Sequence, residues 1–239
     1  MFKPLLSRIV GTLYAMPFVG VRVRGLVESF RGERNYQNRT YWNESLQGWA
    51  ASYLGGTLAI DLRNSMTVLL AKQVAPAAKS VLDLGCAGGT LALCLGSEYD
   101  TYCGVDISDV AIANATELLD GPGGNPAISH QLAVSTVQDF QPPRLFDVII
   151  FNEVMYYLPL TQIADAVRRY SGYLTADGVI LISLKDQQQC RCVLTVVLKE
   201  LEFLHGIVYQ QVTGRPDWKI VYSREAPGFL VNAFKPKKN

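Results

Sequence analysis

A glycine-rich turn and a distant aspartate are the residues of this chain whose types and spacing could do chemistry. The segment Val81–Thr90 reads VLDLGCAGGT, so an apolar strand runs directly into a turn that begins at Gly85. Glycine permits a positive φ and lets a ligand approach the backbone closely. Asp106 follows Gly85 by 21 residues and ends the apolar segment YCGVD. An acid at about 20 residues beyond such a turn is placed to hold the two hydroxyls of a ribose.

The elements that must position these residues alternate between strand and helix. Strands are predicted at 80–84, 101–105, 128–137, 146–151, 178–184, 207–212, 219–223 and 229–234. Helices are predicted at 58–74, 110–119, 161–174 and 192–204, with a helical stretch from the glycine turn to Leu95. This alternation implies right-handed crossovers and a mostly parallel, doubly wound sheet, hence an α/β fold. Such sheets bind ligands beyond the carboxyl ends of their strands, where the glycine turn falls.

The apolar face of the first predicted helix is read from its spacing. Apolar residues recur at helical intervals, and Pro76 ends the run. The predicted inward residues are Leu58, Leu62, Met66, Leu69, Leu70 and Val74.

At the glycine turn the sequence resembles the class I S-adenosylmethionine-dependent methyltransferases. Their signature is a strand that ends D/E-x-G-x-G-x-G, and DLGCAGG at 83–89 matches it with Ala87 in place of the middle glycine. The resemblance continues through GVDIS at 104–108, VQDF at 137–140, FDVIIFNEVMYYLP at 146–159 and LTADGVILIS at 174–183. It implies a Rossmann-like, seven-stranded sheet, S-adenosylmethionine as cofactor and S-adenosylhomocysteine as product. It also implies that residues 1–57 form an N-terminal helical cap and residues 58–239 the cofactor-binding domain.

The resemblance also implies which residues contact the cofactor. Those expected at its methionine end are Gly85, Cys86, Gly89 and Asn152, with Asp83 supporting the turn. Those expected at its nucleoside are Asp106 on the ribose, Ile107 flanking the adenine, and Asp139 with Phe140 at the adenine amine. Two simpler interpretations stay open, since Asp106 could cap the next helix and Asp139 could be a solvated loop acid.

The segment after the fourth strand is expected to face the methyl acceptor. It reads NEVMYYL from Asn152, and tyrosines stand where many small-molecule methyltransferases carry histidine. The catalytic candidates are Glu153 and Tyr157, and the acceptor-binding candidates are Tyr36, Tyr41, Trp42 and Tyr156. The alternative is that the segment only packs under the strand. The pattern E-V-x-Y-Y-L is also similar to the rhizobial nodulation N-methyltransferases, which favours amino or sugar-like acceptors and leaves N- against O-methylation open.

Composition narrows the function classes. The net charge is +1, from 22 basic and 21 acidic residues, which argues against a nucleic-acid partner. The five cysteines include no CxxC pair and no histidine cluster accompanies them, so no metal site or disulfide framework is expected. The glycines at 85, 88 and 89 do not match the G-x-G-x-x-G spacing of dehydrogenases. A non-catalytic binding protein of methyltransferase shape and a nucleic-acid methyltransferase remain the alternatives.

The N-terminal segment 1–24 combines apolar residues with Lys3, Arg8, Arg22 and Arg24. Its apolar run is shorter than the roughly 20 residues that a membrane-spanning helix needs. We expect a cytoplasmic protein. Whether the segment is a cap on the protein's own core or makes peripheral contact with a membrane stays open.

Overall fold

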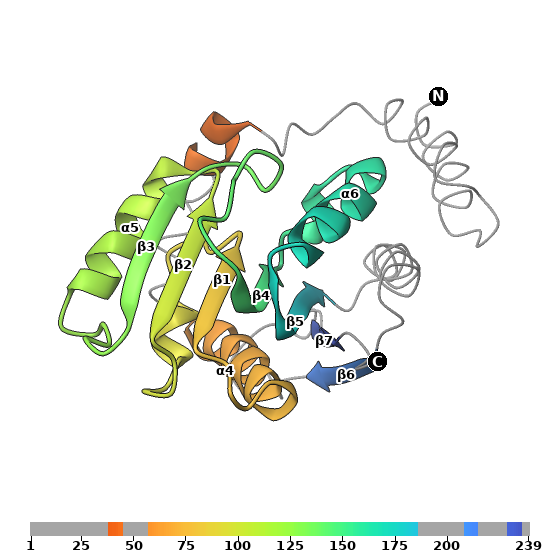
Figure 1. The fold of residues 1–239 in the computed structure, drawn as a ribbon. Helices are drawn as coiled ribbons and strands as arrows, with labels where there is room; N and C mark the ends of the chain where they lie inside the picture. Colours follow the sequence, from red (N-terminus) through yellow and green to blue (C-terminus); the bar gives the residue numbers. More distant parts are fainter. Residues whose placement is uncertain (1–37, 45–56, 186–207, 215–228, 236–239) are drawn as a thin grey trace, which may run out of the picture.

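One sheet organises the chain in the computed structural model, which describes residues 38–44, 57–185, 208–214 and 229–235 (Figure 1). Its strands are β1 (Ser80–Leu84), β2 (Thr101–Asp106), β3 (Ser129–Val134), β4 (Phe146–Asn152), β5 (Leu174–Lys185), β6 (Val208–Gly214) and β7 (Phe229–Lys235). The helices are α4 (Thr57–Val74), α5 (Asp109–Asp120) and α6 (Leu160–Ser171), with 3-10 turns η1 (Ala92–Cys94) and η2 (Met155–Tyr157). Residues 39–44 form a further short helix, which we call the cap helix.

The strand order is β3-β2-β1-β4-β5-β7-β6, and the sheet has seven strands. The pairings from β3 through β5 are all parallel, and β7 runs antiparallel to both β5 and β6. The prediction of a doubly wound, mostly parallel seven-stranded sheet is therefore confirmed. The direction of winding reverses between β1 and β4, so the carboxyl ends of these two neighbours are where such a sheet places a ligand.

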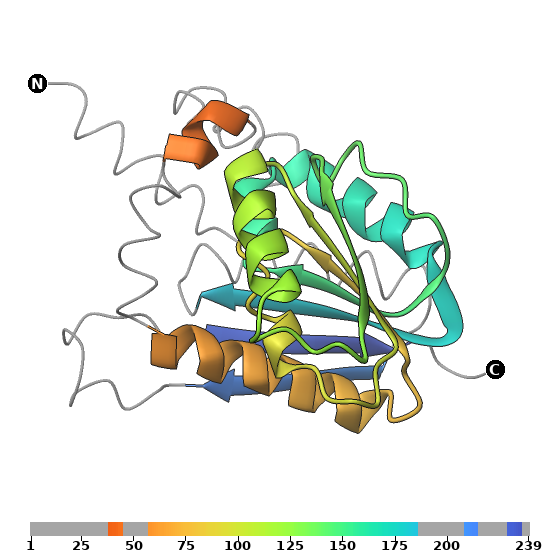
Figure 2. The ribbon, with the colours of Figure 1, turned by 90° about the vertical axis from the view of Figure 1, so that its left-hand side faces the viewer.

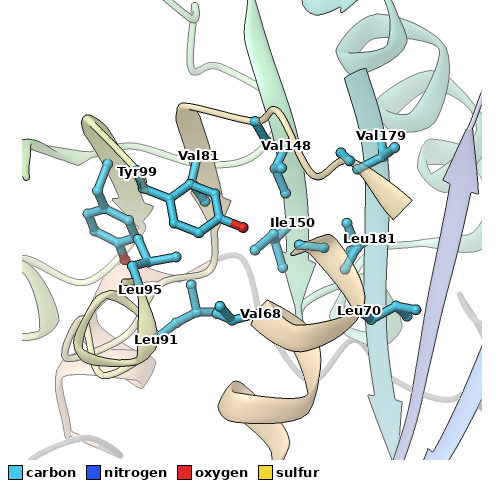
Figure 3. Packing of buried hydrophobic residues seen from close by; sticks show 14 of the residues in the cluster. Val68, Leu70, Val81, Leu91, Leu95, Tyr99, Val148, Ile150, Val179 and Leu181 are labelled. Carbon is cyan, nitrogen blue, oxygen red and sulfur yellow. The ribbon is translucent and has the colours of Figure 1, made fainter. Parts of the chain in front are cut away.

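Helices cover both faces of the sheet (Figure 2). On one face, α4, η1 and α5 pack against the strands, and Figure 3 shows Val68 and Leu70 of α4 beside Val81, Ile150 and Leu181. On the other face, α6 packs through Ile163, Val167 and Tyr170. The central strand β4 is buried along nearly its whole length, as its unbroken apolar run predicts for a strand covered on both sides.

The buried face of α4 differs from the predicted one. Leu69 is 64% exposed, whereas Asn64 and Thr67 are fully buried beside Val68 and Ala71. Leu70 is buried as predicted, and Met66 and Val74 pack against the same core cluster, so among the described side chains the apolar spacing is wrong only at Leu69.

One predicted helix and three predicted boundaries are corrected as well. The stretch after the glycine turn contains only the 3-10 turn η1 and no α-helix, and Gly96 follows directly after its end. Strand β3 ends at Val134, before the predicted end at 137. Helix α6 ends at Ser171, before the predicted end at 174, and strand β5 therefore begins at Leu174 and not at 178. The predicted helix 192–204 and strand 219–223 lie outside the described residues.

No helix in the described ranges is long and apolar enough to cross a membrane. The segment 1–24 lies outside those ranges, so the two alternatives for it, a cap on the protein's own core or peripheral membrane contact, both stay open. The division into residues 1–57 and 58–239 also stays a prediction.

Candidate functional site

The glycine turn after β1 depends on left-handed backbone conformations. Gly85 has φ +79°, Ala87 +46° and Gly89 +75°. A Cβ on Gly85 would lie 2.8 Å from Cβ of Val154, closer than carbon atoms can pack, so only glycine lets the segment after β4 lie against the turn. Ala87 occupies a conformation that costs a residue with a Cβ of order 1–2 kcal/mol. The sequence therefore builds strain into the middle of the predicted cofactor loop.

Asp106 holds this strained residue in place. Its Oδ2 accepts a hydrogen bond from the Ala87 N–H at 3.0 Å, and its Oδ1 accepts one from the Ser108 N–H at 2.9 Å. Burial raises the pKa of the Asp106 carboxyl, and the backbone N–H donors oppose that rise. The next helix is capped by Ser108, whose side chain accepts from the Ala111 N–H, so Asp106 is not its cap. Each carboxylate oxygen keeps capacity to accept a further hydrogen bond from a ligand hydroxyl.

Cys86 and Gly89 lie differently in the turn from Gly85. The Cys86 thiol is buried against Gly104, where an added Cβ would come within 3.0 Å of its sulfur, and burial raises the pKa of that thiol. Gly89 packs against α5, because a Cβ there would lie 3.0 Å from Cβ of Ala115. Only the backbone of Cys86 and Gly89 is thus offered to a ligand, and their expected contact with the methionine end stays a prediction.

The segment after β4 gathers the polar candidates beside the turn. Asn152 is buried, and its Oδ1 accepts from the Ser183 hydroxyl at 3.1 Å. Glu153 has φ +56°, a rare conformation for a residue with a long side chain. The Tyr156 hydroxyl donates to Glu153 Oε2 at 2.6 Å, and Nη1 of Arg63 lies 4.0 Å from the same oxygen. Strain of this kind gathers at functional sites, where the surroundings hold it.

The cap helix connects this segment to the nucleoside side of the site. The ring of Trp42 meets that of Tyr157 edge to face at a centroid distance of 4.8 Å, and Tyr157 in turn lies against Tyr156. On its other side, Arg39 Nε donates to the Ile107 carbonyl at 3.1 Å, and Asn43 accepts from the Ser108 hydroxyl at 2.6 Å. Figure 1 shows this helix, in orange-red, beyond the ends of β2 and β3. The structure thus brings Trp42 to the predicted acceptor segment, while Tyr41 is 40% exposed and Tyr36 lies outside the described residues.

The remaining adenine candidates follow β3. The exposed Asp139 accepts from the Thr136 hydroxyl at 2.7 Å and so closes a local turn, and Phe140 packs at the edge of the core. Arg169 of α6 donates to the carbonyls of Gln138 and Phe140 and anchors this loop. Neither arrangement tests the expected adenine contact, which stays a prediction for Asp139 and Phe140.

Sequence reasoning missed three polar residues at this edge: Arg63, Asn64 and Ser183. The Ser183 hydroxyl accepts a hydrogen bond from the Glu153 N–H at 3.1 Å and so joins β5 to the segment after β4. No sequence signal marked the first two, because they stand between the apolar positions of a predicted helix, where a polar residue normally faces solvent. Over the described residues, no group of three His, Cys, Asp or Glu side chains is placed to hold a metal ion, and His130 pairs with Asp120 of α5.

Comparison with known proteins agrees with this architecture. Residues 59–213 match the methyltransferase domain family. Nodulation protein S of Rhizobium tropici is 25% identical over 161 residues, which are 67% of this chain and 65% of that protein. The ubiquinone biosynthesis O-methyltransferase of Rickettsia felis is 24% identical over 120 residues, which are 50% of this chain and 47% of that protein. The chain thus spans less than two thirds of the length of either relative.

A solved structure gives the same fold. The N-methyltransferase NodS from Bradyrhizobium japonicum WM9, in complex with S-adenosyl-L-homocysteine, superposes with a TM-score of 0.58 at 21% identity, over 74% of this chain and 86% of that one. The fold and the site define a class I S-adenosylmethionine-dependent methyltransferase. The chain belongs to the methyltransferase domain family.

The residues at the carboxyl edge fit the cofactor of this class. Asp106, a partly buried carboxylate with spare acceptor capacity, ends β2 and is the residue expected to hold the ribose. The backbone of the strained turn Gly85–Gly89 lies next to this carboxylate, through the Ala87 N–H. Gly88 has no other atom within 4 Å of where a Cβ would lie, so the backbone there is open. Both features suit S-adenosylmethionine, whose ribose hydroxyls need acceptors and whose methionine end needs close approach to the backbone.

Proposed function

We propose that the chain transfers a methyl group from S-adenosylmethionine to a nitrogen or oxygen of a small-molecule or sugar-like acceptor, with S-adenosylhomocysteine as product. The observation that carries this proposal is the contact between the glycine turn and the segment after β4. A Cβ on Gly85 would collide with Val154, so the predicted cofactor loop and the Glu153–Tyr157 segment share one edge. The cofactor supplies an electrophilic methyl group on a sulfonium, and the chain must align an acceptor with it and take up a proton.

Within the proposal, Glu153 takes up the proton that the acceptor releases. Its carboxylate already has three neighbours, the Tyr156 hydroxyl, the Ser183 hydroxyl and the Arg63 guanidinium. These contacts fix the orientation of the carboxylate, and a general base gains most from a fixed geometry. Tyr157 is proposed to line the acceptor position together with Trp42, since their rings are in contact.

The surroundings favour an amine over a hydroxyl as acceptor. The Tyr156 hydroxyl contacts the Glu153 carboxylate, and the Tyr156 ring continues through Tyr157 to Trp42. A carboxylate at the end of a row of aromatic rings attracts a cationic group by charge and cation–π interactions. The similar proteins named above include both chemistries, an N-methyltransferase and an O-methyltransferase. With nearly balanced net charge in this chain, we propose a small molecule as acceptor and no nucleic acid.

The test begins with the cofactor. Calorimetry should detect binding of S-adenosylhomocysteine to the wild type, and Asp106→Ala should weaken it by roughly 2–3 kcal/mol because two charge-assisted hydrogen bonds to the ribose are lost. The matched control is Asp165→Ala, since Asp165 is exposed on α6, where it pairs with Arg168. Binding of NAD in place of S-adenosylhomocysteine would refute the proposal.

The acceptor is then sought with a labelled methyl donor. Amino sugars, hydroxylated sugars and small amines are incubated with the wild type and with Asp106→Ala. We expect label transfer to an amino compound by the wild type and a strongly reduced rate in the variant. Transfer to an RNA or DNA probe, with none to the small molecules, would contradict the proposed acceptor class.

A further inference from the structure

The turn at residues 136–140 follows β3 and begins beside the end of β2. The Ser135 N–H donates to the Asp106 carbonyl at 2.8 Å, so the turn starts next to the residue expected to hold the ribose. Thr136 accepts from the N–H groups of the residues three and four positions later, at 3.0 Å through its hydroxyl and at 3.1 Å through its carbonyl. These hydrogen bonds close the turn without any ligand.

Side chains of α6 hold the backbone carbonyls of this turn. The Arg169 guanidinium donates to two of them, those of Gln138 and Phe140. The Tyr170 hydroxyl donates to a third, that of Val137, at 2.8 Å. A guanidinium carries its N–H groups in a rigid fork, so it can hold two carbonyls of one turn at a fixed separation. The conformation of the turn therefore depends on α6, a helix that follows it by about 20 residues in the chain.

The side chain that this turn presents to solvent is a carboxylate. Asp139 is exposed and is the only ionisable residue in 135–140. One of its oxygens accepts from the Thr136 hydroxyl at 2.7 Å, which leaves further acceptor capacity on the carboxylate. A ribose on Asp106 has the glycine turn on its β1 side, where the Ala87 N–H donates to Asp106 at 3.0 Å. The base on that ribose would extend to the β3 side, toward a carboxylate that suits an N–H donor.

We propose that Arg169 is a positioning residue that sets the preference of the site for adenine. It acts through the turn, because its guanidinium fixes the backbone on both sides of Asp139 and so holds that carboxylate at the exocyclic amine of the base. That the base is adenine rests on the proposed function. A purely structural Arg169 would stabilise the fold and leave the preference between bases unchanged.

The experiment compares two ligands that differ only in the base. S-inosylhomocysteine has a carbonyl oxygen where S-adenosylhomocysteine has the amine, and it carries a proton on the neighbouring ring nitrogen. Calorimetry on the wild type should show about a 10- to 100-fold preference for S-adenosylhomocysteine, because a fixed carboxylate gains a charged hydrogen bond from the amine and repels the carbonyl.

Arg169→Met should lower this preference to less than about threefold, since a released turn no longer holds the carboxylate at the amine. Arg169→Lys keeps the charge and can reach one carbonyl, so it should restore part of the preference. Tyr170→Phe keeps the buried ring and removes one hydrogen bond to the turn, so its effect should be smaller. The matched control is Arg168→Met, because Arg168 is exposed on the same helix and pairs with Asp165 at 3.3 Å.

A double-mutant cycle shows whether Arg169 acts through Asp139. Asp139→Asn should remove most of the preference, because an amide can accept from the amine or donate to the carbonyl. Adding Arg169→Met to it should change the preference no further. Equal losses of affinity for the two ligands in Arg169→Met and Tyr170→Phe would make α6 a purely structural support and overturn the proposal. A wild type without preference would overturn it too, whereas failure of the wild type to bind S-adenosylhomocysteine would refute the proposed function.

Discussion

At the scale of one residue, Glu153 has a strained backbone conformation that contacts of its backbone and side chain hold in place. Its φ of +56° is costly, and the backbone N–H is tied to the Ser183 hydroxyl while the carboxylate meets Tyr156 and Arg63. Contacts on both backbone and side chain are what a strained residue needs to persist. They also place the carboxylate beside Tyr156, whose ring is in contact with that of Tyr157. This makes Glu153 the residue whose replacement separates the two acceptor chemistries.

We expect Glu153→Gln to lower turnover with an amine acceptor by about tenfold, and Tyr156→Phe to cost about as much, because both changes disturb alignment. With a hydroxyl acceptor, Glu153→Gln alone should cost about 10²–10⁴-fold, the usual size of general-base help. Steady-state kinetics with the acceptor found in the screen decides between them. In either case the affinity for S-adenosylhomocysteine should change by less than about threefold. A turnover unaffected by Glu153→Gln would remove Glu153 from the mechanism.

Asp83 predicts a pH dependence of folding. Burial raises the pKa of its carboxyl from 3.8 to about 7, and the Tyr102 hydroxyl opposes the rise. Between these values the folded state keeps a proton that the unfolded state has lost. The free energy of unfolding therefore falls as the pH rises from about 4 to about 7, by at most about 1.4 kcal/mol per pH unit. Above that window the contribution is constant.

The measurement is urea unfolding at several pH values between 5 and 8 for the wild type and for Asp83→Asn. The asparagine does not titrate, so the difference between the two proteins isolates Asp83 from other groups such as Asp106. We expect the wild type to lose stability relative to the variant as the pH rises. A constant difference over the whole range would contradict the assigned burial of the charge.

At the scale of elements, the turn between β1 and η1 depends on Gly85. Its positive φ and the 2.8 Å approach to Val154 both exclude a side chain. We expect Gly85→Ala to lower the free energy of unfolding by about 1–3 kcal/mol and to weaken S-adenosylhomocysteine binding by displacing the segment after β4. Gly88→Ala is the matched control for the free energy of unfolding, because nothing lies within 4 Å of its added Cβ. Chemical unfolding of both variants and calorimetry of Gly85→Ala test this, and equal losses of stability in the two variants would refute it.

The elements that sequence alone predicted well are the strands with continuous apolar runs. β1, β4 and β7 lie within one residue of their expected ends, because strands buried on both faces leave little choice of register or length. The prediction failed where few residues decide an element. The stretch before Gly96 is too short to sustain a helix, and α4 turns Asn64 and Thr67 inward against the apolar pattern.

The residues of the candidate site also fall into two groups, those that the sequence could predict and those that it could not. The turn and Asp106 were predictable, because their chemistry requires particular residues at a fixed spacing. Arg63, Asn64 and Ser183 were not, since they reach the site only after α4 and β5 have packed against β1 and β4. Long-range contacts of this kind leave no periodic signal in the sequence.

At the scale of the whole described structure, the cap helix contacts both sides of the candidate site, the proposed cofactor side and the proposed acceptor side. It touches residues 107–109 beside Asp106 through Arg39 and Asn43, and it touches Tyr157 through Trp42. It adds no strand and belongs to neither core cluster, so its contacts serve the edge of the sheet rather than the core. Loss of these contacts should therefore weaken ligand binding more than it lowers the free energy of unfolding.

We expect Trp42→Ala to raise the acceptor KM by about 2- to 12-fold, the worth of one aromatic contact of 0.5–1.5 kcal/mol, with S-adenosylhomocysteine affinity nearly unchanged. Asn43→Ala should raise the same KM, because it undocks the whole helix, and should also weaken S-adenosylhomocysteine binding a few-fold through the loss of its contact with Ser108. Leu69→Ala, at a position 64% exposed on α4, should do neither. Kinetics with the identified acceptor and calorimetry give the two readouts. If Trp42→Ala weakened cofactor binding and left the acceptor KM unchanged, the cap helix would belong to the cofactor site alone.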